Sequence, residues 1–311
     1  MIASKRYERN SAELLVMLDI FYELFKNVDM FGTMFSHFPI LRFLAPNYSG
    51  YTSFVEAHRR FFNFIQLEYQ NHMDTYKDYA QPRDLIDAYL REIAIAEPGS
   101  SFTEQQLLSV CLDMFLSGSE TTNKSFGFCF LHLTRNPDIQ QRAYEEIKRV
   151  VGLDRLPEWT DRPNLPYIEG IVLEAIRMFV GHTFGLPHRA LCNTRLCGYN
   201  IPKDTMVVVC FRGMVMNPED FPEPFKFKPE RYIKDGVFAV PEAYNPFGLG
   251  RHRCMGDILA KQNLFVLTAA VLQNFRILPL IPGKYPEDNP LDGATASVQP
   301  YEAFVMPREQ L

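Results

Sequence analysis

The strongest constraint on the fold is a decapeptide near the end of the chain, FGLGRHRCMG at residues 247–256. It places one cysteine, Cys254, among three glycines and directly before a long apolar segment that is predicted to be helical. Glycines allow a tight bend and let a flat ligand approach the main chain. A helix N-terminus stabilises negative charge and so favours a thiolate. Such a loop suits a soft metal centre, above all haem iron, because a planar macrocycle needs that clearance. The alternative is a structural cysteine beside an ordinary turn.

Composition narrows the class of protein. The chain has 311 residues, of which 47% are hydrophobic, which is enough to form a substantial core. A net charge of -5 at pH 7 supplies no basic surface to neutralise phosphates and argues against nucleic acid as a partner. The six cysteines form no CxxC pair and no cluster at zinc spacing, so we expect reduced thiols. Aromatic residues make up 14%, which suits a bulky apolar interior.

Hydrophobic periodicity predicts a mainly α-helical protein with small β-sheets. Ser11 and Thr103 are expected as helix N-caps, and Pro82 is expected in the first turn of its helix. Residues 186–211 and the C-terminal tail carry short strand-like pieces between turn residues. The predicted helices cover residues 11–27, 52–76, 82–93, 103–135, 137–152, 166–179 and 255–275.

The segment at residues 29–46 is rich in Phe and Met and has no clear period. It fits either a buried connector or a loop that exposes apolar side chains to a membrane surface or a substrate entrance. No apolar run in the chain is long enough to cross a bilayer. The first fifteen residues place charges where the apolar core of a signal peptide would be.

The decapeptide resembles the haem-binding loop of the cytochrome P-450 family, the haem-thiolate monooxygenases, whose pattern is F-x-x-G-x-R-x-C-x-G. Phe247, Gly250, Cys254 and Gly256 match this pattern, whereas its arginine falls on His252. In the family that arginine pairs with a haem propionate. An imidazole at this position can still donate a hydrogen bond to the same group.

Further motifs occur in the order expected for the same family. SGSETT at residues 117–122 resembles the A/G-G-x-D/E-T-T/S element of the long helix that crosses the haem. The resemblance implies that Glu120 and Thr121 manage water and protons beside bound dioxygen, since cleavage of the O–O bond consumes protons. The alternative is that the Ser and Thr hydroxyls bond to helix carbonyls and Glu120 faces solvent.

Two charged motifs imply a structural network. EAIR at residues 174–177 resembles the family's E-x-x-R, and its charged ends lie three residues apart on one helix face. KPERY at residues 228–232 resembles the family's P-E-R-F segment. The resemblance implies a network of Glu174, Arg177 and Arg231 that holds the scaffold around the cysteine loop. The alternative for E-x-x-R is a solvated surface pair.

GLPHRA at residues 185–190 resembles the segment between that helix and the first sheet. The resemblance implies that His188 reaches a haem propionate and that the residues before it line a substrate pocket. Core packing is the alternative for each pocket residue. The expected pocket residues are Phe115, Val180, Thr183, Phe184 and Leu186.

The resemblance implies a monooxygenase that inserts one oxygen atom of O2 into an apolar lipid, hormone or xenobiotic. Cys254 would be the axial ligand of haem b iron, and electrons would come from NADPH through NADPH-cytochrome P-450 reductase, because no G-x-G-x-x-G nucleotide loop follows a strand. Members of this type lie on the cytosolic face of the endoplasmic reticulum membrane. The residues of these motifs are most similar to those of microsomal animal members of the second clan, which includes insect enzymes.

The resemblance covers about residue 11 to the C-terminus. It implies a single partial cytochrome P-450 domain over residues 1–311, from about the F helix onward, without the N-terminal anchor and the first helices and strands. Two other functions remain open at this point. One is a truncated, non-catalytic haem-thiolate protein. The other is an isomerase or dehydratase, against which the pair Glu120-Thr121 argues, because such enzymes need no proton relay.

Overall fold

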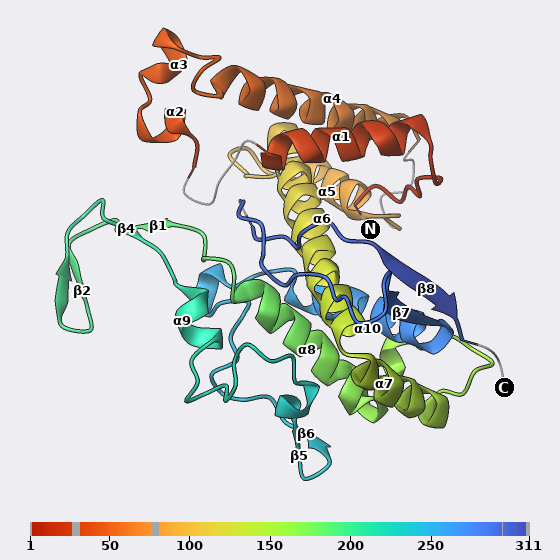
Figure 1. The fold of residues 1–311 in the computed structure, drawn as a ribbon. Coiled ribbons are helices and arrows are strands. Elements are labelled where there is room, and N and C mark those ends of the chain that lie inside the picture. The colour runs from red at the N-terminus through yellow and green to blue at the C-terminus, as the bar shows by residue number, and fades with distance from the viewer. Residues whose placement is uncertain (1, 27–31, 76–80, 294, 309–311) are drawn as a thin grey trace. The chain divides into compact units, whose positions relative to one another are not determined.

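The computed structural model describes residues 2–26, 32–75, 81–293 and 295–308 (Figure 1). The chain forms two compact units, residues 1–120 and residues 121–311, and each has its own hydrophobic core. The boundary falls inside one long helix, α6 (Glu104–Arg135). The predicted fold class, mainly helical with small sheets, is confirmed.

Amphipathic helices build the first unit. Phe21 of the first helix and Phe61 of the fourth lie with ring centroids 5.8 Å apart inside the core of this unit. Both belong to stripes with helical spacing, which explains why these segments bury one face and expose the other. The helices are α1 (Ala12–Lys26), α2 (Met34–His37), α3 (Leu41–Leu44), α4 (Tyr51–Thr75), α5 (Leu85–Ala94) and the first half of α6.

Helix starts follow local capping chemistry. The hydroxyl of Ser11 accepts the N–H of Leu14 at 3.2 Å, and the hydroxyl of Thr103 accepts the N–H of Gln106 at 3.2 Å, so both predicted N-caps are confirmed. The expectation for Pro82 is wrong. Helix α5 begins at Leu85, because the carboxylate of Asp84 accepts the N–H of Asp87 and caps the helix two residues after the proline.

The described part of the Phe- and Met-rich segment, residues 32–46, contains the two short helices α2 and α3. None of these residues is buried, so the buried-connector interpretation is wrong for them. Phe43 and Leu44 are 72% and 74% exposed. Residues 29–31 of the predicted segment lie outside the described residues.

The second unit is centred on α8 (Pro166–Val180). Every residue from 170 to 180 is buried, because α8 is apolar over most of its surface and its buried charges, Glu174 and Arg177, pair with each other. The carboxylate of Glu146 accepts the N–H groups of Tyr167 and Ile168 at 3.0–3.1 Å and thereby caps the start of α8. The other helices of this unit are the second half of α6, α7 (Pro137–Val150), α9 (Phe211–Val215), α10 (Asp257–Asn274) and the 3-10 turns η1 (Trp159–Asn164), η2 (Pro229–Tyr232) and η3 (Gly250–His252).

Small antiparallel ladders complete the second unit. β1 (His188–Arg189) pairs with β4 (Met206–Val207), and β2 (Thr194–Leu196) pairs with β3 (Tyr199–Ile201). β5 (Ile233–Lys234) pairs with β6 (Val237–Phe238). β7 (Phe275–Pro279) pairs with β8 (Ala303–Pro307), and Ile277 lies opposite Val305. The strand-like pieces predicted within residues 186–211 correspond to β1, β2, β3 and β4, and Phe211 already belongs to α9.

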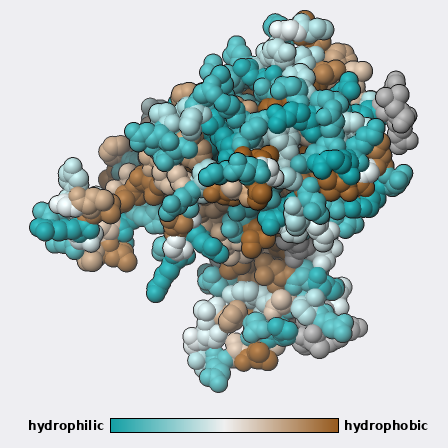
Figure 2. All heavy atoms as spheres, turned by 90° about the horizontal axis from the view of Figure 1, so that it is seen from below, coloured by the Kyte–Doolittle hydropathy of each residue, from teal (hydrophilic) through white to brown (hydrophobic). Residues whose placement is uncertain are grey.

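The described helices include none that combines the length and the apolarity needed to cross a membrane. Exposed apolar side chains nevertheless occur in the second unit. Figure 2 shows brown and tan side chains in the lobe at the left, the side on which Figure 1 draws the β2–β3 hairpin. Leu191 and Leu196 in and before this hairpin are 77% and 57% exposed.

Candidate cofactor site around Cys254

The cysteine loop is closed by its own backbone. The N–H of Cys254 donates to the carbonyl oxygen of Phe247 at 2.8 Å. Gly248 and Gly250 adopt φ values of 74° and 76°, which side chains rarely tolerate. A Cβ atom built on Gly250 would meet nothing within 4 Å. The glycines therefore serve the turn and leave open space beside it, as a flat ligand requires.

Cys254 presents its thiol at the surface. The side chain is exposed and forms no disulfide. Helix α10 begins three residues later, and the carbonyl oxygen of Gly256 accepts the N–H of Ala260 at 2.8 Å. Leu249 and Met255 are 72% and 80% exposed beside it. A soft ligand atom, free space and flanking apolar side chains fit the haem group that the sequence predicts.

The loop is attached to the protein through Phe247. This ring packs against the hydrophobic core of the second unit, and the ammonium group of Lys261 lies 4.9 Å from the ring centroid. A cation at that distance is attracted to the aromatic face. One end of the loop is therefore anchored, while the residues that would meet a cofactor stay accessible.

Two histidines from distant segments meet near the loop. The rings of His188 in β1 and His252 in η3 lie edge to face, with centroids 5.5 Å apart. Both residues are exposed. Two imidazoles in this arrangement can direct N–H groups at one anion. The structure thus brings together the two residues that were expected, separately, at a haem propionate.

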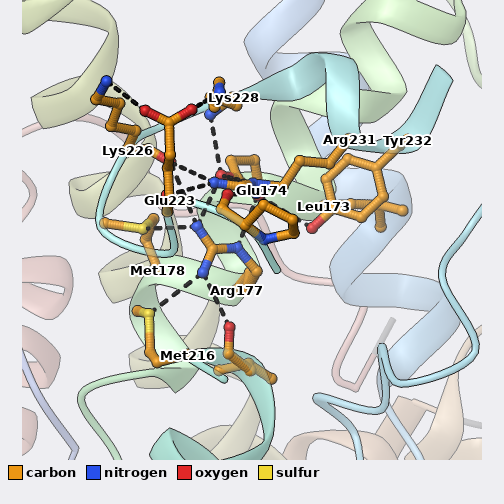
Figure 3. A network of polar contacts seen from close by, with 12 residues as sticks. Leu173, Glu174, Arg177, Met178, Met216, Glu223, Lys226, Lys228, Arg231 and Tyr232 are labelled. Atoms are coloured by element: carbon orange, nitrogen blue, oxygen red, sulfur yellow. Dashed lines mark hydrogen bonds and ion pairs between the residues drawn. The ribbon is translucent and has the colours of Figure 1, made fainter. Parts of the chain in front are cut away.

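The charged network predicted from E-x-x-R joins Glu174, Arg177 and Arg231 (Figure 3), with Glu174 and Arg177 fully buried and Arg231 partly exposed. The guanidinium of Arg177 donates to both carboxylate oxygens of Glu174, at 2.8 and 2.7 Å, and both side chains are 0% exposed. Nε of Arg231 donates to the same carboxylate at 3.1 Å. The surface-pair interpretation is therefore wrong. Burial lowers the pKa of Arg177 and the Glu174 carboxylate raises it, with a net increase, so the guanidinium stays charged.

Further donors complete the network around Glu174. The backbone N–H of Lys228 donates at 2.9 Å and the hydroxyl of Tyr232 at 3.1 Å. Burial raises the pKa of Tyr232 well above its ordinary value, which keeps this hydroxyl protonated and donating. The guanidinium of Arg231 also donates to the carbonyl oxygens of Glu223 at 2.6 Å and of Lys226 at 3.2 Å. The network therefore fastens the segment after α9 to α8.

Tyr244 extends this support toward the cysteine loop. Its buried hydroxyl donates to the carbonyl oxygen of Leu173 at 2.9 Å, and its ring lies 5.4 Å from that of Tyr232. Phe247 follows three residues later. The sequence analysis did not predict Tyr244, Tyr232 or Glu146 as supporting residues. Only Tyr232 could have been found from the sequence, because it is the last residue of the KPERY segment.

The predicted pocket residues do not form one cluster. Val180 is buried in the core, and the hydroxyl of Thr183, also buried, donates to the Val180 carbonyl at 3.1 Å. Phe184 and Leu186 are 44% and 81% exposed. Phe115 belongs to the first unit, where it packs edge-on against Phe61 with ring centroids 6.0 Å apart. Core packing therefore accounts for Val180 and Phe115.

SGSETT occupies the middle of α6, at the boundary between the units. Glu120 is the last residue of the first unit and Thr121 the first residue of the second, and both are half-buried. The hydroxyl of Ser117 donates to the Asp113 carbonyl at 2.7 Å, and that of Ser125 donates to the Thr121 carbonyl at 2.9 Å. Hydroxyl groups around the motif thus bond back to the helix.

Comparison with known proteins identifies the same family as the sequence motifs. The cytochrome P450 family model matches residues 1–304. The chain is 59% identical over its whole length to probable cytochrome P450 303a1 of Drosophila melanogaster, and covers 62% of that protein. It is 31% identical to farnesoate epoxidase of Bombyx mori, over 99% of the chain and 62% of the relative. It is also 31% identical to cytochrome P450 2E1 of Oryctolagus cuniculus, over 83% of the chain and 57% of the relative.

Proposed function

The chain belongs to the cytochrome P450 family, and on this premise we propose that it carries the haem-thiolate part of a monooxygenase that acts on an apolar organic substrate. The observation that carries the proposal is the exposed Cys254 thiol on a glycine turn with open space beside Gly250. Bound haem b supplies the activation of O2, from which one oxygen atom enters the substrate. The two units would together form the C-terminal portion of one P450 domain.

Each site residue has a proposed task. Cys254 binds the haem iron as thiolate, and the turn of Phe247, Gly250 and Gly256 gives the macrocycle its clearance. His188 and His252 donate hydrogen bonds to a haem propionate, which is supported by the contact between their rings. The Glu174 network holds the scaffold in place and touches no reacting atom.

Proton supply is assigned to α6. Glu120 and Thr121 would hold and pass protons at their carboxylate and hydroxyl oxygens, since an apolar pocket offers no other source. Thr183, Phe184 and Leu186 would contact the substrate; Phe184 and Leu186 are 44% and 81% exposed, and Thr183 is buried beside Val180. Electrons would come from NADPH through NADPH-cytochrome P-450 reductase.

The substrate is proposed as a lipid, a hormone or a xenobiotic. The Bombyx mori relative is named farnesoate epoxidase, which supports a terpenoid lipid among these. The rival proposal is a haem-thiolate protein that binds without turnover. The chain spans about three-fifths of the length of these relatives.

One spectrum tests the thiolate assignment. The purified protein is loaded with haem, reduced and exposed to carbon monoxide. We expect the red-shifted Soret band of a thiolate adduct, and we expect Cys254→Ser to lose it. The assignment fails if the variant keeps the parent's band. NADPH consumption with added reductase then separates turnover from binding alone.

Membrane contact and a place on the cytosolic face of the endoplasmic reticulum are proposed for the first unit. Phe38, Ile40, Phe43 and Leu44 are 62–74% exposed, and the guanidinium of Arg42 lies 4.7 Å from the Phe43 ring centroid. Apolar side chains beside a cation suit the boundary between acyl chains and headgroups. Co-sedimentation with phosphatidylcholine–phosphatidylserine vesicles should fall several-fold in Phe43→Ser/Leu44→Ser. Leu67→Ser, at a 67% exposed position of α4, is the matched control.

A further inference from the structure

A lysine on α6 holds a loop from the far end of the sequence. Nζ of Lys124 donates to the carbonyl oxygen of Thr295 at 2.9 Å and approaches the hydroxyl of the same residue at 3.0 Å. Lys124 is half-buried and lies three residues after Thr121, so the two share a face of the helix. Both residues and the loop belong to the second unit.

A second contact lies one turn further along the same face. A Cβ atom built on Gly127 would stand 3.3 Å from a methyl carbon of Val298, so the loop rests directly on the helix there. Leu291 and Ser297 exchange backbone hydrogen bonds of 2.7 and 3.0 Å. Residues 291–298, of which 294 is not described, therefore form a self-closed turn, called here the 291–298 loop. Figure 1 draws this C-terminal segment in blue beside α6.

We propose that Lys124 is a positioning residue that fixes the 291–298 loop on the Thr121 face of α6, where the loop forms a wall of the substrate site. The assignment of the wall rests on the proposed function, which places the substrate beside Thr121. The tether itself rests only on the two contacts above.

A tether explains this lysine better than an anion receptor does. An ammonium group has three N–H donors, and two of them are directed at Thr295. A hydrogen bond from a charged donor to a carbonyl is worth more than one between neutral groups. The loop therefore loses its charge-assisted hydrogen bond to α6 when the charge is removed, while Gly127 and Val298 remain in contact.

Hydrogen exchange tests the tether without haem. In Lys124→Met, we expect the amides of residues 295–298 to exchange about tenfold faster than in the parent, which corresponds to one charge-assisted hydrogen bond. Lys124→Arg keeps a charged donor and should restore most of the protection. Lys148→Met, on the exposed face of α7, is the matched control. Unchanged exchange in Lys124→Met would overturn the proposal.

Ligand size tests the wall. Imidazole and clotrimazole both ligate haem iron through nitrogen, but only clotrimazole is bulky enough to press on the surrounding walls. In Lys124→Met, the Kd of clotrimazole should change three- to tenfold and that of imidazole less than twofold. Equal changes in both ligands would refute the wall. If the parent protein shows no thiolate spectrum, the proposed function fails, and the exchange experiment still decides for or against the tether.

Discussion

The Glu174 network and the Cys254 loop lie in the same unit but differ in burial and in how their polar groups are paired. Glu174 and Arg177 are charged and 0% exposed, whereas every residue from 249 to 255 is exposed. The network satisfies its charges internally, while the loop leaves its thiol available. The comparison teaches that buried polar contacts concentrate in the supporting network, whereas the residues proposed to bind haem stay exposed.

The largest effect is expected from Glu174→Ala. The substitution leaves Arg177 buried without its carboxylate and should lower the free energy of unfolding by about 3–5 kcal/mol. Urea unfolding followed by circular dichroism measures the loss. The double variant Glu174→Leu/Arg177→Met, which removes both charges, should lose less. If the free energy of unfolding of Glu174→Ala lay within about 1 kcal/mol of the parent's, the buried network would not support the fold more than the exposed loop does.

A second test uses pH. The ring of His132 is 4% exposed and stacks on Phe227 with centroids 4.9 Å apart. Burial lowers its pKa to about 3. Below about pH 6.5 the unfolded chain takes up a proton that the folded state refuses, so stability falls as the pH falls from about 6.5 to about 3. We expect about 2 kcal/mol of loss by pH 4.5 from this group.

His132→Phe should abolish this part of the acid sensitivity, as measured by urea midpoints at pH 7 and pH 4.5. Equal acid sensitivity in the parent and in His132→Phe would contradict the assignment to the buried ring.

A smaller loss is expected from Glu146→Ala. The carboxylate caps α8 by accepting the N–H groups of Tyr167 and Ile168, so its removal leaves buried donors unpaired. We expect a decrease of about 1–2 kcal/mol in the free energy of unfolding. Glu145→Ala, one position earlier on α7 and exposed, should change it by less than about 0.5 kcal/mol. Similar values for the two variants would show that the cap carries no weight.

The smallest effect on stability is expected from Cys254→Ser. The side chain is exposed, so the free energy of unfolding of the haem-free protein should stay within about 0.5 kcal/mol of the parent. The same variant should lose the thiolate spectrum. A large loss of stability would mean that the thiol supports the fold. The contrast between the supporting Glu174 network and the exposed Cys254 loop would then not hold.

Local chemistry made the helices and two of their caps predictable. The caps of α1 and α6 need only a hydroxyl and the N–H three residues later, both of which lie within one short segment. The prediction that Pro82 lies in the first turn of its helix was wrong, because the carboxylate of Asp84 caps the helix and α5 begins only at Leu85. The segment around Phe43 had no period to analyse, so only the structure decided its exposure.

The supporting shell of the candidate site was harder to predict. Spacing alone placed Glu174 beside Arg177, but their complete burial depends on segments that pack on α8 from other parts of the chain. The hydroxyl of Tyr244 bonds to Leu173, and no motif connects these two positions. Similarly, nothing in the sequence links Lys124 to Thr295. Such contacts depend on tertiary packing and leave no periodic signal.

Several hydrogen-bond donors converge on the carboxylate of Glu174, and this limits which residues can be substituted in related sequences. Glu174 accepts hydrogen bonds from Arg177, Arg231, Tyr232 and the Lys228 amide at once, so loss of this one carboxylate strands all of these donors. Among related sequences we therefore expect Glu174 to vary least of these residues. Leu249 and Met255, which touch solvent, are free to diverge one at a time.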